Sequence, residues 1–170
     1  MRRLAASCVL LVLAGCGGGG ACTTTRRAAG DGSRTLTIPI RVLQQGRQVI
    51  ALALVRIDGK GPFTFAIDTG ASQSLVDAQV AARIHAQKTS VKTRVAGVAA
   101  VGRGRLISVR HWSVGGVTLP ATRVLSANLP FGDANGGVQG LLGSDMLSGF
   151  DVVTIDYGKQ VLRLHPRARR

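Results

Sequence analysis

The chain has 170 residues, of which 45% are hydrophobic and only 4% aromatic, and it carries a formal net charge of +14 without a single glutamate. This length is enough for one domain with its own hydrophobic core, which must be built from aliphatic side chains. The basic residues are scattered and no aromatic residues alternate with them, which argues against a stacking platform for nucleic acid.

The N-terminus has the organisation of a targeting segment. Met1-Arg2-Arg3 precedes an apolar stretch too short to span a bilayer, which ends in Leu13-Ala14-Gly15-Cys16. This end resembles a bacterial lipobox, in which the cysteine is acylated and becomes the new N-terminus. We therefore expect a lipoprotein signal peptide over residues 1–15 and lipid, such as palmitate, on Cys16. The expected location is the bacterial cell envelope, anchored to a membrane and facing the periplasm or the exterior. An ordinary signal peptide with a chance cysteine is the alternative.

The segment after the lipobox differs from the rest of the chain in composition. Residues 16–34 are mainly Gly, Thr, Ala and Arg without apolar periodicity, which predicts a flexible tether. One domain is expected over residues 35–166, followed by a basic tail over residues 167–170. With Cys16 carrying lipid, Cys22 is the only cysteine left beyond the signal peptide, so no intramolecular disulfide is expected.

Short extended runs alternate with turn signals throughout the domain. In chain order we expect strands over 35–43, 49–57 and 63–67, a helical stretch over 74–84 with Asp77 as its N-cap, a long hairpin over 91–114, extended chain over 117–129, a loop over 130–140, a short strand and helical turn over 141–150, and a closing hairpin over 151–165. This order predicts a β-rich domain of barrel or sandwich type with two short helices.

The predicted strand over residues 63–67 ends at an acid surrounded by small residues, in the sequence FAIDTGAS. Gly70 lets the backbone approach a substrate or a second loop closely. The Thr69 hydroxyl can both donate and accept a hydrogen bond. Backbone N–H groups of the turn and the Ser72 hydroxyl are expected to hold one oxygen of Asp68. A carboxylate positioned rigidly in this way is suited to catalysis.

Two segments resemble the signatures of the retropepsin-like aspartic proteases, the family that includes bacterial aspartyl protease domains. FAIDTGAS, Phe65 to Ser72, is similar to the active-site loop, and GLLGSDML, Gly140 to Leu147, is similar to the second signature. The resemblance implies an all-β fold, a small closed β-barrel with two short helices and a flap hairpin. In such a fold the apolar-apolar-Gly strand runs beneath the aspartate loop and supports it.

The resemblance also implies an aspartic endopeptidase that acts on a peptide or protein without a cofactor or metal. The implied catalytic residue is Asp68, and the implied supports of the catalytic pair are Thr69, Gly70, Ala71 and Ser72. Two such aspartates are needed, and the chain contains only one Asp-Thr-Gly sequence. We therefore expect a homodimer in which Asp68 meets its symmetry mate.

Further roles follow from the same resemblance. The implied flap residues are Gly97, Val98, Ala99, Ala100 and Gly102, and the implied loop-supporting strand contains Leu141, Leu142 and Gly143. The expected flap contains no aromatic residue, which is a departure from the better-known pattern. Trp112 is expected in the core rather than against substrate.

Other candidate sites are weaker. His85, His111 and His165 lie far apart without metal-ligand spacing, and Ser144 is expected to cap the short helix. Two alternatives to the peptidase stay open. One is a catalytically silent lipoprotein of the same fold that binds a peptide or protein partner, and the other is a wall- or lipid-binding β-domain suggested by charge alone.

Overall fold

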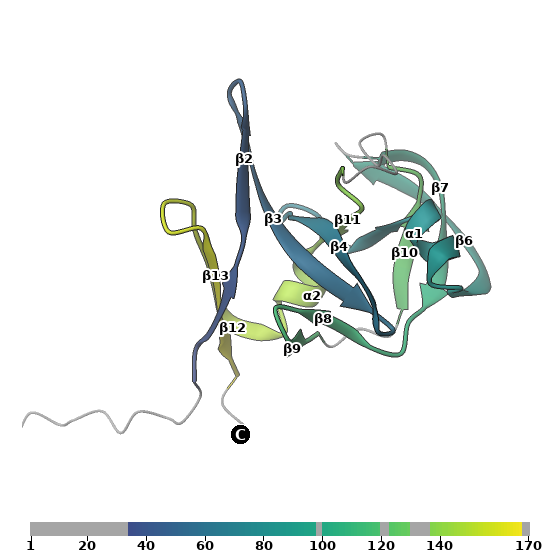
Figure 1. The fold of residues 1–170 in the computed structure, drawn as a ribbon. Helices are drawn as coiled ribbons and strands as arrows, with labels where there is room; N and C mark the ends of the chain where they lie inside the picture. The colour runs from purple at the N-terminus through teal and green to yellow at the C-terminus, as the bar shows by residue number, and fades with distance from the viewer. Residues whose placement is uncertain (1–33, 98–99, 120–122, 130–136, 168–170) are drawn as a thin grey trace, which may run out of the picture. The chain divides into compact units, whose positions relative to one another are not determined.

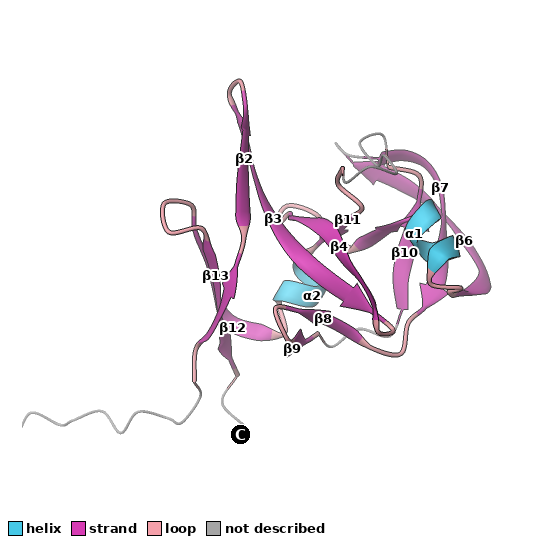
Figure 2. Ribbon diagram, in the orientation of Figure 1, coloured by secondary structure: helices cyan, strands magenta, loops and turns pink. Residues whose placement is uncertain are grey.

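The computed structural model describes residues 34–97, 100–119, 123–129 and 137–167 (Figure 1). The expected signal peptide, nearly all of the tether and most of the basic tail lie outside these residues. The described chain is mostly β with two short helices, which confirms this part of the expected fold class (Figure 2).

The smaller sheet has 3 strands in the order β1-β13-β12, all antiparallel. It contains β1 (Leu36–Pro39), β12 (Phe150–Asp156) and β13 (Val161–Pro166). The predicted closing hairpin is therefore present, and it pairs with the first strand of the domain.

The larger sheet has 10 strands in the order β6-β7-β10-β5-β11-β4-β3-β8-β9, with β2 also paired to β3. Its strands are β2 (Arg41–Gln45), β3 (Gln48–Ile57), β4 (Lys60–Ile67), β5 (Leu75–Asp77), β6 (Gln87–Gly97), β7 (Ala100–Ser108), β8 (Trp112–Val114), β9 (Val117–Thr118), β10 (Arg123–Ala127) and β11 (Gly140–Leu142). The pairings form an open path, so the closed barrel expected from the sequence is not seen among the described residues.

The helices are α1 (Ala78–Arg83) and α2 (Ser144–Leu147). Asp77 is the N-cap of α1, as predicted, because its side chain accepts a hydrogen bond from the Gln79 N–H. The prediction of helix from residue 74 was wrong. Residues 75–77 form β5 instead, because they pair with β10 on one side and β11 on the other, and these ladders outweigh local helix propensity. Neither helix is long and apolar enough to cross a membrane, within the part of the chain described.

The expected single strand over residues 35–43 is divided at Ile40. Its first part, β1, pairs with β13, whereas its second part, β2, pairs with β3 of the larger sheet. The Ile40 N–H donates to the Gln160 carbonyl at 2.9 Å, and the buried Ile40 side chain anchors the crossing. An alternating pattern alone does not reveal such a change of partner.

The predicted hairpin over residues 91–114 is also shorter than expected. β7 ends at Ser108, and Asp58 then accepts hydrogen bonds from the Arg110 and His111 N–H groups, both at 2.8 Å. This contact turns the chain away from β6, so that Trp112 begins a new strand beside β3.

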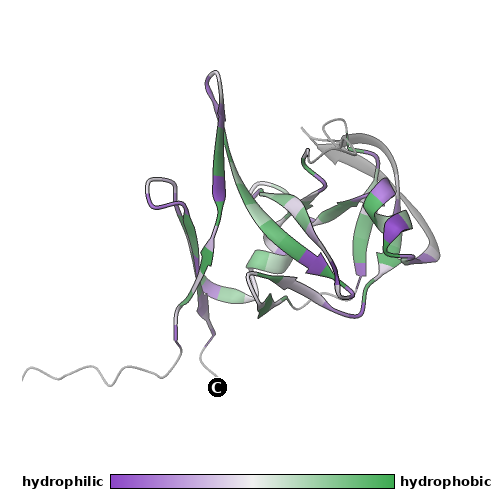
Figure 3. Ribbon diagram, viewed as in Figure 1, coloured by the Kyte–Doolittle hydropathy of each residue, from purple (hydrophilic) through white to green (hydrophobic). Residues whose placement is uncertain are grey.

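The main core lies between the sheets and helices and is largely aliphatic. Trp112 is 1% exposed and meets the Phe65 ring edge-on, with 5.4 Å between ring centroids, which confirms its expected core position. Hydrophobic residues continue along much of β3 (Figure 3). A second, smaller cluster contains Leu75, Leu125, Ala127 and Leu129.

Candidate active site

Asp68 lies at the end of β4, where two parallel strands finish side by side. β4 and β11 pair in register, with Phe65 opposite Gly140 and Ile67 opposite Leu142. The Asp68 N–H then donates to the Leu142 carbonyl at 2.9 Å. Because parallel strands end at the same edge of a sheet, the aspartate loop and the loop after Leu142 emerge together.

The Asp68 carboxylate is held through one of its oxygens. Oδ1 accepts hydrogen bonds from the Gly70 N–H at 3.0 Å and the Ala71 N–H at 3.2 Å. The expected backbone donors are therefore in place, whereas the exposed Ser72 hydroxyl makes no hydrogen bond to Asp68. Oδ2 makes no hydrogen bond within the described residues, so it is free to meet a water molecule or a second carboxyl group.

Two glycines allow the aspartate loop and the chain after Leu142 to pack closely against each other. A Cβ on Gly70 would lie 3.3 Å from Asp68 Oδ1. A Cβ on Gly143 would lie 2.7 Å from the carbonyl carbon of Gln73 and 2.9 Å from the Ala71 oxygen. The sequence Leu-Leu-Gly thus ends in Gly because the aspartate loop passes directly against its backbone.

Ser144 has a different role from the one predicted. The N-cap of α2 is Gly143, and no side chain caps this helix. Ser144 instead donates from its N–H at 2.8 Å and from its hydroxyl at 3.0 Å to the Ala71 carbonyl. The prediction of a capping serine was wrong because the nearest unsatisfied acceptor belongs to the aspartate loop rather than to the helix.

Hydrogen bonds between Ser74 and Asp145 form a second link between the aspartate loop and α2, and sequence reasoning missed it. The Ser74 hydroxyl donates to Asp145 Oδ1 at 2.6 Å, and the Ser74 N–H donates to the same oxygen at 2.9 Å. The same hydroxyl accepts from the Gly143 N–H at 2.8 Å. Ser74 is 0% exposed, so these bonds are shielded from water. A serine placed directly before the short strand β5 was the available signal.

The loop-supporting residues also differ in burial. Leu142 is 0% exposed and belongs to the main core, whereas the half-buried Leu141 packs against the smaller cluster. Thr69 is exposed beside Asp68. The described chain therefore places Asp68, Thr69 and the loop over a support of buried apolar side chains and satisfied backbone groups.

A hairpin lies where the flap was expected. β6 and β7 pair antiparallel, with Val95 opposite Gly102 and Gly97 opposite Ala100. Val98 and Ala99, at the expected tip, lie outside the described residues. The expected residues therefore form a hairpin, and its role as a flap stays a prediction.

No metal centre is found in the described part of the chain, where no group of three or more His, Cys, Asp or Glu residues could hold an ion. The three histidines stay apart, and His165 Nδ1 lies 3.0 Å from the Thr35 hydroxyl. Cys16, the expected lipidation site, lies outside the described residues.

Comparison with known proteins agrees with this geometry. A sequence model of the family described as "Aspartyl protease" matches residues 53–146, a segment that includes both the Asp68 loop and the strand beneath it. No curated protein matches the chain. Among solved structures, a retropepsin-like aspartic protease from Rickettsia conorii is similar, with a TM-score of 0.50 and 19% sequence identity. That match covers 80% of this chain and 97% of the other, and it supports a retropepsin-like fold.

Proposed function

Since this chain belongs to the aspartyl protease family, we propose that it is an endopeptidase in which a pair of Asp68 carboxyl groups activates a water molecule. The observation that supports this proposal is the asymmetric binding of the carboxylate. One oxygen is held by the Gly70 and Ala71 N–H groups, and the other oxygen has no partner within the described residues. A held but incompletely satisfied carboxylate is suited to proton transfer.

The second carboxyl group is proposed to come from a second copy of the chain. The sequence contains one Asp-Thr-Gly. Asp145 accepts two hydrogen bonds from Ser74, and Asp151 pairs with Arg167 at 3.4 Å on the surface. Neither acid lies on a loop like that of Asp68, so a homodimer with two-fold symmetry is the arrangement that supplies a matching partner.

In this dimer the two Asp68 carboxyl groups share one proton, because two close negative charges disfavour each other. The ionised carboxyl group takes a proton from water, which attacks the carbonyl carbon of the peptide bond. The protonated carboxyl group donates to the carbonyl oxygen. The exposed Thr69 hydroxyl is proposed to contact the backbone of the opposite loop and keep the two carboxyl groups aligned.

The β6–β7 hairpin is proposed to cover the bound peptide and exclude water. Its expected flap residues are small or aliphatic rather than aromatic. Peptide backbone contacts rather than a ring in the flap are therefore proposed to hold the substrate.

We further propose that Cys16 carries lipid and anchors the enzyme to a membrane of the bacterial envelope, facing the periplasm or the exterior. This proposal rests on Leu13-Ala14-Gly15-Cys16 after a short apolar stretch. Mass spectrometry of the protein purified from membranes should find an acylated chain that begins at Cys16. An unmodified chain that begins at Met1 would contradict it.

A catalytically silent member of the same fold is the second candidate function. The absence of an aromatic residue from the expected flap favours it, because cover of the substrate is then less complete. Such a protein would bind a peptide or protein partner at the surface around Asp68 without cleaving it.

The two candidates are separated by a cleavage assay on the full chain in detergent, with a peptide library from acid to neutral pH. Asp68→Asn should abolish cleavage and leave the fold intact. Asp151→Asn is the matched control, since it makes the same change at an exposed surface acid, and it should cleave like the wild type. Undiminished cleavage by Asp68→Asn would refute the peptidase mechanism. Cleavage by none of the three proteins would favour the silent binding protein.

Sedimentation of the wild type should show a dimer whose fraction rises with protein concentration. Confinement to a membrane raises the effective concentration, so a weak dimer in solution is sufficient for function. A strictly monomeric chain that still cleaves peptides would contradict the two-chain site.

A further inference from the structure

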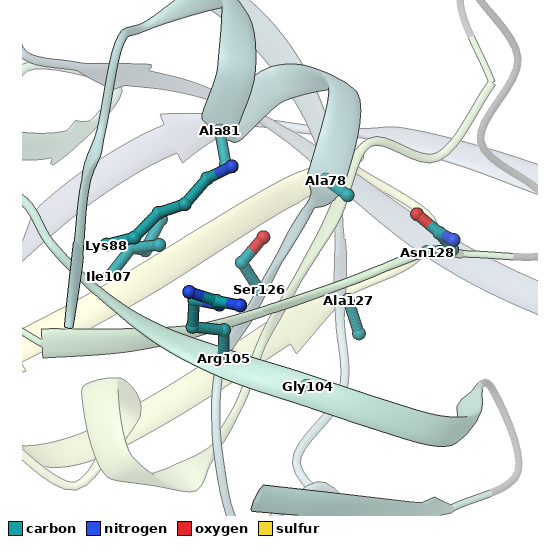
Figure 4. Close-up of a pocket in the computed structure, with 9 residues that line it drawn as sticks. All are labelled: Ala78, Ala81, Lys88, Gly104, Arg105, Ile107, Ser126, Ala127 and Asn128. Carbon is teal, nitrogen blue, oxygen red and sulfur yellow. The ribbon is translucent and has the colours of Figure 1, made fainter. Parts of the chain in front are cut away.

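A pocket lies away from the aspartate loop, at the base of the β6–β7 hairpin (Figure 4). It has a volume of about 340 Å³, at the small end of the range for ligand pockets. Its lining comes from α1, β6, β7, β10 and the residue after β10, and includes none of residues 68–72. The pocket is therefore separate from the proposed catalytic site.

The polar side chains of this pocket lie on the face of the sheet that packs toward the core. Arg105 pairs with Ser126, and two residues further along β7 Ile107 pairs with both Val124 and Lys88. Side chains two residues apart on a strand share a face. Arg105, Ser126 and Lys88 therefore share the face of Ile107, which is 1% exposed.

A partner is stabilising for a partly buried polar group, because burial of an unpaired charge or hydroxyl costs free energy. The Ser126 residue is 9% exposed and Arg105 is half-buried. Neither side chain, nor that of Lys88, makes a hydrogen bond or ion pair within the described residues.

The nearest acid along the chain does not neutralise this cluster. Asp77 precedes α1, but its Oδ1 accepts from the Gln79 N–H and its Oδ2 accepts from the Leu129 N–H. No acidic residue lines the pocket among the residues that the structure describes. Two cations and a hydroxyl therefore face one cavity, and the described part of its wall supplies no counter-charge.

We propose that this pocket binds a small organic anion through a carboxylate or phosphate group. The planar guanidinium of Arg105 can donate two parallel hydrogen bonds to either group. Lys88 and the Ser126 hydroxyl lie with Arg105 on one side of the pocket, and Asn128 lies at its other end (Figure 4). Ala81 and Ile107 supply an apolar wall for the organic part of the ligand.

Lys88 comes from β6, Arg105 from β7 and Ser126 from β10, so a bound anion joins both strands of the hairpin to the strand beside them. The register between β6 and β7 shifts here, between Lys88 and Lys92, so the ladder is locally interrupted. Occupancy of the pocket should therefore stabilise the base of the hairpin without contact to Asp68.

The test is thermal unfolding of the full-length protein titrated with butyrate or with inorganic phosphate, against chloride at equal ionic strength. A saturable rise in Tm with either anion is expected, and the anion that produces it identifies the headgroup. Arg105→Gln and Lys88→Gln should each weaken apparent binding roughly tenfold or more, since each removes a charged hydrogen-bond donor. Arg105→Lys should retain part of the binding because the charge remains.

Arg123→Gln is the matched control, since it makes the same change of charge on β10. Arg123 is exposed, and its spacing of three from Ser126 puts it on the opposite face of the strand. It should bind like the wild type. If Arg105→Gln does not fold, Lys88→Gln at its exposed position keeps the test valid. An unsaturable rise, or the same saturable rise in every variant, would overturn the proposed site.

Discussion

Removal of the Ser74 hydroxyl tests how the aspartate loop is held. In Ser74→Ala, Asp145 Oδ1 loses the donor at 2.6 Å, and the Gly143 N–H loses its acceptor at 2.8 Å. A hydrogen bond to a charged group contributes about 1.5–3 kcal/mol, and a buried N–H left without an acceptor costs about 1–3 kcal/mol. Because Asp145 keeps the Ser74 and Met146 N–H groups as donors, we expect a total loss of about 2–4 kcal/mol in the free energy of unfolding.

The measurement is urea unfolding of the wild type, Ser74→Ala and Ser72→Ala. Ser72 lies in the same loop but is exposed and makes no side-chain hydrogen bond, so its variant should stay within about 0.5 kcal/mol of the wild type. If the free energy of unfolding falls by less than about 1 kcal/mol in Ser74→Ala, or by the same amount in both variants, Ser74 does not hold the two loops together through its hydroxyl.

A double-mutant cycle adds a second check. Asp145→Ala alone also leaves the Ser74 hydroxyl and N–H without their acceptor. Because both variants remove the same contact, the double variant should lose less than the sum of the two, with a coupling of about 1 kcal/mol or more. Additive losses would show that the two side chains act independently.

The remaining predictions concern close packing and pH. Gly143→Ala should lower the free energy of unfolding by about 1–3 kcal/mol and reduce peptide cleavage, because the new Cβ would collide with the Gln73 carbonyl carbon 2.7 Å away. Urea unfolding measures the first effect and the cleavage assay the second. A variant as stable and active as the wild type would mean that the two loops are not in contact. The pKa of Asp156 is lowered from 3.8, first by a hydrogen bond from the Lys159 N–H and then by Arg163. The contribution of Asp156 to stability is therefore complete above pH 3.8 and is lost as the pH falls below that value through the lowered pKa. Asp156→Asn should remove this dependence from the pH profile of Tm. Identical profiles for the variant and the wild type would disprove a stabilising role of the Asp156 carboxylate.

Local sequence was enough to identify the centre of the candidate site. Asp68 follows a buried strand and precedes Gly70, and this order requires only neighbouring residues. The Leu-Leu-Gly segment was recognised in the same way, and its strand pairs beside β4 beneath the loop. Motifs of this kind can be recognised from sequence because the backbone geometry that they need is set within a few residues.

Contacts between distant segments were not predictable in the same way. Ser144 was expected to cap its own helix, yet it donates to Ala71, which lies far back in the chain. Likewise, Asp58 binds the N–H groups of Arg110 and His111 and ends the hairpin early. A polar side chain has several acceptors or donors within reach, and only the folded register decides which one is nearest.

Polar residues on apolar faces are informative once the register is known. Ser74 is a buried residue directly before β5, and its partner Asp145 explains its position. Ser126 lies on a core-facing strand position, and Arg105 is opposite to it, but neither side chain has a partner within the described residues. Leaving a polar group unpaired costs more at the fully buried Ser74 than at Ser126 and the half-buried Arg105, which line a pocket. An anion in the pocket would give Arg105 and Ser126 the kind of partner that Asp145 gives Ser74.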